Sequence, residues 1–128
     1  MNSEKLLSRH TLKNGLLLEF WDLSRPMLGD RCQAVVEARV AVAVTADTLP
    51  AELRPQLGQV SAALGKEVVF SQQEVRTFVE TGATPGLLKL IEEQLLGSLQ
   101  DYLGHPEFAS RLIRKRYADR QKETGWQH

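Results

Sequence analysis

The sequence predicts an α+β domain. An antiparallel sheet of three to four strands, starting with an N-terminal hairpin, is expected to carry about three helices packed mainly on one face. Three observations lead to this prediction. An Asn-Gly pair separates two short apolar runs near the N-terminus, a valine-rich segment alternates apolar and polar residues, and later segments repeat apolar residues every three or four positions. Strands grouped in the N-terminal part of the chain and helices in the C-terminal part are typical of this class.

Composition limits the kind of protein this can be. A chain of 128 residues can bury one core, so residues 1–128 are expected to form a single domain. Sixteen basic residues offset sixteen acidic ones, which argues against nucleic acid as a partner. No apolar run reaches the roughly 20 residues of a membrane span, and the N-terminus lacks the apolar centre of a signal peptide. We therefore expect a cytoplasmic protein without a membrane span.

The first strands are predicted around a tight turn. Asn14-Gly15 suits the positive φ angles of a type I′ turn, which joins two antiparallel strands. The second strand is expected over residues 16–23. Because alternate side chains of a strand point to opposite faces, Leu18 and Phe20 share one face and Trp21 lies on the other.

A valine-rich strand is predicted over residues 32–44. Apolar residues at even positions alternate there with a partly polar set at odd positions, which is typical of an antiparallel strand with one solvated face. This apolar set is expected to share one core with a long helix in the second half of the chain. The residues of that core are Val36, Val40, Val42, Leu88, Ile91, Leu95 and Leu99.

A short helix is expected between Leu49 and Leu64, where leucine and valine recur at helical spacing. Pro55 falls inside this stripe, and proline is tolerated at the first position of a helix but not in its interior. The pattern therefore predicts either a kink near Pro55 or a helix that begins there. Gly65 is the expected C-cap.

Residues 71–81 fit two alternatives. Ser71 and Glu74 would form the capping box of a helix. The following β-branched and aromatic residues would instead form a strand, paired with residues 68–70 through a Ser-Gln-Gln-Glu turn. The strand is the preferred interpretation because Thr77, Phe78 and Val79 are poor helix formers.

Two helices are predicted at the end of the chain. The longer one covers residues 84–103, with Thr84 as N-cap, Pro85 in the first turn and Gly104 as C-cap. A last helix is expected over residues 106–122, followed by a frayed tail over residues 123–128. The core-facing stripe of the longer helix comprises Leu88, Ile91, Leu95, Leu99 and Tyr102, widened by Leu87, Leu96 and Leu103.

The loop over residues 22–31 is the first candidate site. Its aspartate, serine, proline and glycine residues are those a turn between two strands requires. As an alternative, Ser24, Arg25 and Arg31 could bind a small anion or a nucleotide, because guanidinium and hydroxyl groups donate hydrogen bonds to phosphate oxygens. Asp22 and Asp30 lie close enough in the sequence to neutralise both arginines, which favours the structural turn.

The last predicted helix is the second candidate. Residues 111–122 contain six basic groups and one acidic group, and four of the basic side chains share a stripe away from the apolar residues. The preferred interpretation is a solvated helix face, because basic residues near a helix C-terminus complement the helix dipole. An acidic protein partner is the first alternative and nucleic acid the second. The stripe comprises Arg111, Arg114, Lys115 and Lys122.

A homodimer is predicted from the sheet face that carries Trp21. The helical stripes are mostly one-sided, so the helices would cover one face and leave the indole in water unless a second subunit buries it. The residues expected at this interface are Trp21, Val35 and Ala41.

Other chemistry receives little support from the sequence. The three histidines and Cys32 lie at no metal-ligand spacing, so no metal or cofactor is expected. Glu92 lies at the edge of an apolar stripe, where its carboxylate would either extend into solvent or pair with a basic group from another element. No phosphate loop, nucleophile elbow or dinucleotide-binding glycine pattern is present. We therefore expect a non-catalytic protein-interaction or regulatory domain, with a small-anion or nucleotide-binding domain as the alternative.

Overall fold

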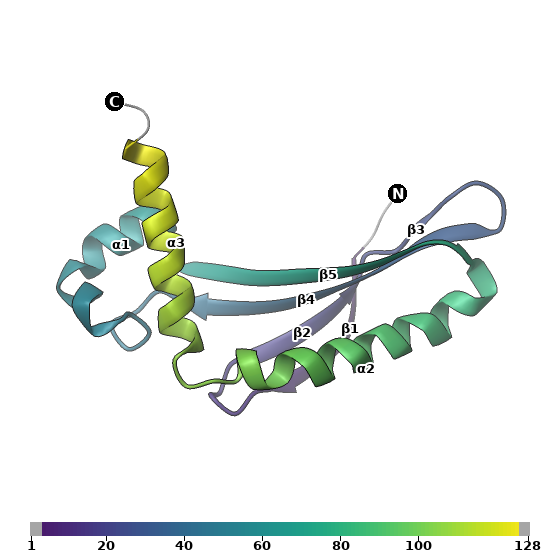
Figure 1. Ribbon diagram of the computed structural model, residues 1–128, viewed down its shortest axis with the longest axis horizontal. Coiled ribbons are helices and arrows are strands. Elements are labelled where there is room, and N and C mark those ends of the chain that lie inside the picture. Colours follow the sequence, from purple (N-terminus) through teal and green to yellow (C-terminus); the bar gives the residue numbers. More distant parts are fainter. Residues whose placement is uncertain (1–3, 126–128) are drawn as a thin grey trace. The chain divides into compact units, whose positions relative to one another are not determined.

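The computed structural model describes residues 4–125 and confirms the α+β class (Figure 1). An antiparallel sheet is combined with three α-helices and two short 3-10 helices, η1 and η2. The elements are β1 (Lys5–Thr11), β2 (Leu17–Asp22), β3 (Arg25–Pro26), β4 (Arg31–Ala43), η1 (Ala51–Gln56), α1 (Leu57–Leu64), β5 (Glu67–Glu80), η2 (Thr81–Ala83), α2 (Thr84–Leu103) and α3 (Phe108–Gly125). The strands come in the order β1-β2-β4-β3, and β5 also pairs with β4.

The chain divides into two compact units. The first comprises the chain up to Val40 together with Ser71–Gly104, and the second comprises Ala41–Phe70 together with the chain from His105 onward. Both β4 and β5 contribute residues to each unit. Of the predicted core, Val42 therefore belongs to the second unit, while the other six residues belong to the first.

The first hairpin forms at the predicted place but with a different turn. Gly15 has a φ of +88°, whereas Asn14 keeps a negative φ, so the type I′ prediction is wrong. The Leu12 amide donates to the Leu16 carbonyl, and the Gly15 amide donates to the Leu12 carbonyl. This is the three-residue loop in which only the last residue is left-handed. The Asn14 amide group also donates to the Leu103 carbonyl, which satisfies one of the unpaired carbonyls at the end of α2.

The segment after β2 is mostly strand. Asp22 lies opposite Val36, and β3 continues in the same register, with Arg25 opposite Gln33. The Met27 amide then donates to the Arg31 carbonyl across the tip, where Gly29 has a φ of +68°. The predicted loop over residues 22–31 is therefore the end of one long hairpin, with three residues at its tip.

The region that fitted two alternatives is a strand. β5 runs without interruption through Ser71–Glu74, so the expected turn at these residues is wrong although the strand is confirmed. The Val44 amide donates to the Lys66 carbonyl at one end of the β4–β5 pairing. At the other end, the Thr81 amide donates to the Asp30 carbonyl. Val44 lies fourteen positions after Asp30, but Thr81 lies fifteen positions after Lys66, so β5 contains one extra residue. Within this stretch Phe78 has a φ of +56°, which identifies it as a β-bulge.

In the first unit, α2 runs along one face of the sheet (Figure 1). Leu18 and Phe20 are fully buried on this face, as predicted, together with valine and alanine residues of β4. Tyr102, predicted in the centre of the stripe, is exposed, whereas Leu103, predicted at its widened edge, is fully buried. The buried face of α2 is therefore rotated toward Leu103 at this end. Thr84 is the first residue of α2 rather than its N-cap, and its hydroxyl donates to the Glu80 carbonyl. The buried residues of α2 are Leu88, Ile91, Leu95, Leu99 and Leu103.

The second unit is built around α1 and α3. Pro55 lies inside η1, and α1 begins two residues later and ends at Leu64. Gly65 is its C-cap, as predicted, with a φ of +85°. The rings of Phe70 and Phe108 meet edge to face, 5.8 Å between centroids. The last helix begins at Phe108 and continues through Gly125, three residues into the expected tail, whose remainder lies outside the described residues.

Candidate functional site

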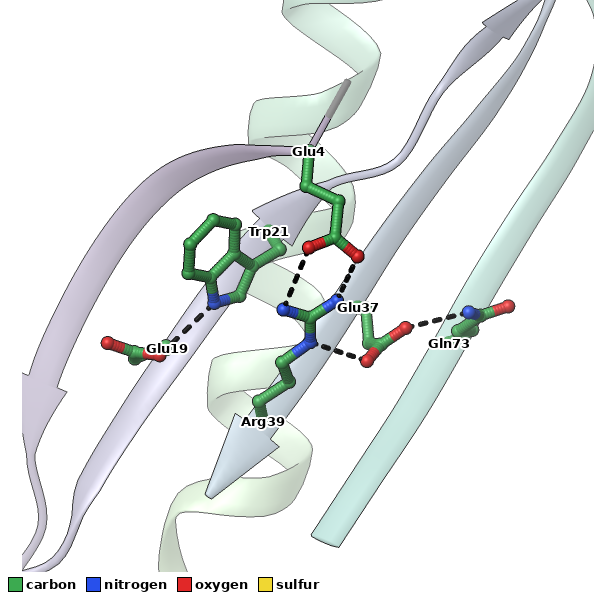
Figure 2. Close-up of polar contacts among 6 residues, drawn as sticks. All are labelled: Glu4, Glu19, Trp21, Glu37, Arg39 and Gln73. Carbon is green, nitrogen blue, oxygen red and sulfur yellow. Dashed lines mark hydrogen bonds and ion pairs between the residues drawn. The ribbon is translucent and has the colours of Figure 1, made fainter. Parts of the chain in front are cut away.

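The sheet face opposite α2 carries a cluster of paired charged groups around Trp21 (Figure 2). Trp21 on β2 lies opposite Glu37 on β4, and Glu19 lies opposite Arg39. Trp21 is thus on the face away from Leu18 and Phe20, as predicted. It is half-buried rather than left in water.

Arg39 lies at the centre of this cluster. Its two terminal nitrogens donate to the Glu4 carboxylate at 2.7 and 3.3 Å, and its Nε donates to Glu37 Oε1 at 2.6 Å. Its guanidinium carbon stands 4.9 Å from the centroid of the Trp21 ring, which is cation–π range. The indole N–H of Trp21 donates to Glu19 Oε1 at 3.1 Å.

Glu37 is the one buried charged residue among those described. Burial raises the pKa of its carboxyl, but hydrogen bonds from Gln73 and Arg39 and the charge of Arg39 outweigh burial and lower the pKa below its ordinary value. Gln73 Nε2 donates to Oε2 at 2.7 Å, so both carboxylate oxygens have donors. The group is therefore held ionised and ties β4 to β5.

This face offers less to a second subunit than the sequence suggested. Val35 is only 3% exposed within the single chain, so a dimer interface could bury little more of it. Trp21 already has partners on both its ring face and its N–H. Ala41 is exposed but belongs to the second unit. The prediction of a homodimer through these residues stays untested.

The three residues predicted to bind an anion have separate surroundings near the hairpin tip. The Ser24 hydroxyl accepts from the Val35 amide at 3.0 Å, which holds the hairpin together. Arg31 pairs with Glu80 at 3.6 Å rather than with Asp22 or Asp30, while Arg25 is exposed. The structure therefore places Arg31 in an ion pair and Ser24 in a structural contact.

An open hollow of about 610 Å³ lies beside this tip. Two acidic residues and one basic residue line it, so its charge does not favour an anion. The hydroxyl and amide of Thr81 both donate to the Asp30 carbonyl, which joins the tip to the end of β5. The lining residues are Leu28, Gly29, Asp30, Arg31, Glu80, Thr81 and Gly82.

Two large apolar side chains are exposed in this region of the first unit. Leu28, at the tip of the hairpin, is 89% exposed, and Phe78, at the bulge of β5, is 62% exposed. The sequence pattern of β5 could not reveal Phe78 as a special position, because its left-handed backbone follows from the extra residue in the pairing. We refer to Leu28 and Phe78 with the hollow as the tip surface.

The predicted basic stripe lies on the exposed side of α3. Arg111 pairs with Glu107 at 3.0 Å, and Arg114 pairs with Glu52 of η1 at 2.6 Å. Lys115 and Lys122 are exposed. Half of the stripe is thus engaged by carboxylates of its own unit.

Arg116 instead donates from Nη2 to the Val69 carbonyl at 2.8 Å. Glu92 accepts from the Ser8 hydroxyl, which differs from both alternatives predicted for it, solvent and a basic group.

The sequence pattern does not predict the contact of Ser8 with Glu92. Ser8 Oγ also lies 3.1 Å from His10 Nε2. Because the carboxylate engages the serine rather than the histidine, this is not the Ser–His–acid arrangement that activates a nucleophile. Alternation along β1 could have shown that Ser8 and His10 share a face, but not that Glu92 meets them.

Cys32 is buried, and its sulfur lies 2.9 Å from Thr84 Oγ1. Among residues 4–125, no group of three or more His, Cys, Asp or Glu side chains is placed to hold a metal ion. The same part of the chain contains no helix that is both long enough and apolar enough to cross a membrane.

In comparisons with known proteins, no family model, curated protein or solved structure matches this chain.

Proposed function

We propose that this protein is a non-catalytic protein-interaction domain that contacts its partner through the tip surface. The observation that carries the proposal is the backbone of Phe78, whose φ is +56°. A side chain other than glycine in this conformation costs about 1–2 kcal/mol. Glycine would remove this cost.

The Phe78 side chain contributes little to the stability of the fold. Most of its side chain is exposed, so it contributes only part of the stabilisation of a buried phenylalanine. Residues in unfavourable backbone conformations are often found at sites of function. An exposed aromatic ring is also a common anchor in protein interfaces.

Leu28 supports the same surface. It is almost fully exposed at a hairpin tip that the Thr81–Asp30 hydrogen bonds connect to the end of β5. Single exposed apolar residues are ordinary. Here, however, Leu28 lines the hollow and Phe78 lies two residues before Glu80, which also lines it, so a partner seated on the hollow is near both side chains. The polar lining of the hollow would form the rim of such a contact.

The test compares Phe78→Gly with the wild-type chain in two measurements. Urea-induced unfolding should change by less than about 1 kcal/mol, because relief of backbone strain offsets the lost contacts and the added chain entropy. Truncation of a buried phenylalanine would instead cost about 3–5 kcal/mol. A loss of that size would show that Phe78 serves the core and would contradict the proposal.

The second measurement is crosslinking of partners in cells that express each variant. Phe78→Gly and Leu28→Ser should lose the same crosslinked species. Leu90→Ser, which removes an exposed leucine from α2, is the matched control and should retain them. If all three variants keep the same crosslinks, the tip surface is not the contact.

A further inference from the structure

β5 is an edge strand of the sheet in the part of the chain that the structure describes. Among the described residues it pairs with β4 on one side only. The Lys66 carbonyl accepts from β4, so the alternate residues beginning at Glu67 direct their backbone groups away from β4 as far as the bulge. Two contacts agree with this alternation, since side chains of Arg116 and Arg76 donate to the carbonyls of Val69 and Val75.

The side chains around Val75 are self-complementary. Val75 is 41% exposed, and it lies between Glu74 and Arg76. When two identical strands pair antiparallel with Val75 opposite Val75 of the partner subunit, Glu74 falls opposite Arg76 of the partner subunit. By the same two-fold symmetry, Arg76 falls opposite Glu74 of the partner subunit, so the arrangement contains two ion pairs between the strands.

We propose that β5 pairs antiparallel with β5 of a second copy of this chain, around a two-fold axis at Val75. The backbone groups of Gln73, Val75 and Thr77 would exchange hydrogen bonds with the partner strand. Val75 would pack against its symmetry mate on one face, while the ion pairs form on the other. In the free chain Arg76 contacts Glu74 and the Val75 carbonyl, and both contacts are exchanged for equivalent ones across the axis.

β1, at the opposite edge of the sheet, has features that prevent pairing with a strand of another molecule. β1 carries Lys5 and Arg9, which have the same sign, and its pairing with β2 is irregular between Leu6 and Ser8. Like charges and irregular pairing are common means of preventing association between sheet edges. Around Val75, β5 instead carries one acidic and one basic residue, and its bulge falls beyond the proposed contact.

Charge reversal tests the arrangement. Sedimentation velocity at micromolar concentration should show the wild-type chain as a dimer of the 14.4 kDa subunit. Glu74→Arg places two arginines opposite two arginines, and Arg76→Glu places two glutamates opposite two glutamates. Each variant alone should have a dissociation constant raised at least about tenfold.

Mixing the two variants provides the decisive measurement. The Glu74→Arg chain and the Arg76→Glu chain are complementary to each other, so an equimolar mixture should recover the dimer. The control variants are Glu93→Arg and Lys89→Glu, which make the same charge changes at exposed positions of α2. Each of these control chains should be dimeric by itself, without mixing. Circular dichroism verifies that every variant is folded.

A wild-type chain that stays monomeric up to its solubility limit overturns the proposal, as does a mixture of folded variants that does not recover the dimer. Val75→Pro provides a second test that does not depend on charge, since it removes an amide that points away from β4. It should also dissociate the dimer. Phe78→Gly should leave the dimer intact, which separates this contact from the one proposed at the tip surface.

Discussion

Replacing Glu37 with glutamine tests whether the buried carboxylate stabilises the sheet. The substitution keeps the size of the side chain and removes its charge. Glu37 accepts from Arg39 at 2.6 Å and from Gln73 at 2.7 Å, and its side chain is 12% exposed. Hydrogen bonds to charged groups contribute about 1.5–3 kcal/mol, roughly twice the contribution of neutral ones. Since glutamine retains one acceptor oxygen, Glu37→Gln should lower the free energy of unfolding by about 1–2 kcal/mol at neutral pH.

The dependence on pH identifies the charge as the cause. The folded state lowers the pKa of Glu37 below its ordinary value of 4.5. The carboxylate therefore contributes its full stabilisation above that ordinary value and loses it as the pH falls through the lowered pKa. The difference in unfolding free energy between the wild-type chain and Glu37→Gln should shrink over this acid range, because glutamine does not titrate.

Urea-induced unfolding followed by circular dichroism across this pH range measures both effects. Glu4→Gln is the matched control, because Glu4 pairs with the same arginine but is more than half exposed. Exposed ion pairs contribute about 1 kcal/mol or less, so this variant should change stability less than Glu37→Gln does. A difference below about 0.5 kcal/mol for Glu37→Gln, or one that stays constant in acid, would refute the reasoning.

Three further predictions concern other parts of the first unit. Leu95→Ala should lower the free energy of unfolding by about 2–5 kcal/mol, measured by urea denaturation, because Leu95 is buried on α2. Gly104→Ala should cost about 1–3 kcal/mol, since a Cβ there would lie 2.8 Å from a backbone carbonyl oxygen. Gly97→Ala, where a Cβ meets open space inside a helix, should raise stability by up to about 1 kcal/mol. The opposite order for the two glycines would contradict these contacts. Removing Arg25 and Arg31 together should change stability by less than about 1 kcal/mol, because their surroundings are exposed. A larger loss would show that these arginines hold the hairpin tip.

The periodicity of the sequence determined much of the architecture. Alternation over residues 32–44 predicted β4, and the same rule placed Leu18 and Phe20 on the face opposite Trp21. Helical spacing identified α2 and all five of its buried residues, with Leu103 among those predicted to widen the stripe. These features depend on local geometry, because a strand or a helix presents its side chains with a fixed period whatever surrounds it.

Other features depended on which segments meet. Residues 71–81 fitted a helix or a strand until pairing with β4 decided between them. Tyr102 and Leu103 lie next to each other in the sequence, and only packing determined which is buried.

The contacts of the candidate sites required the tertiary structure altogether. Glu4, Arg39 and Gln73 come together because three separate segments lie side by side on one sheet face, and their spacing in the sequence contains no sign of it. The left-handed backbone of Phe78 arises because β5 has one residue more than β4 needs. Local preference determines the type of each element, but strand register determines which polar groups meet, and register is a property of the assembled sheet.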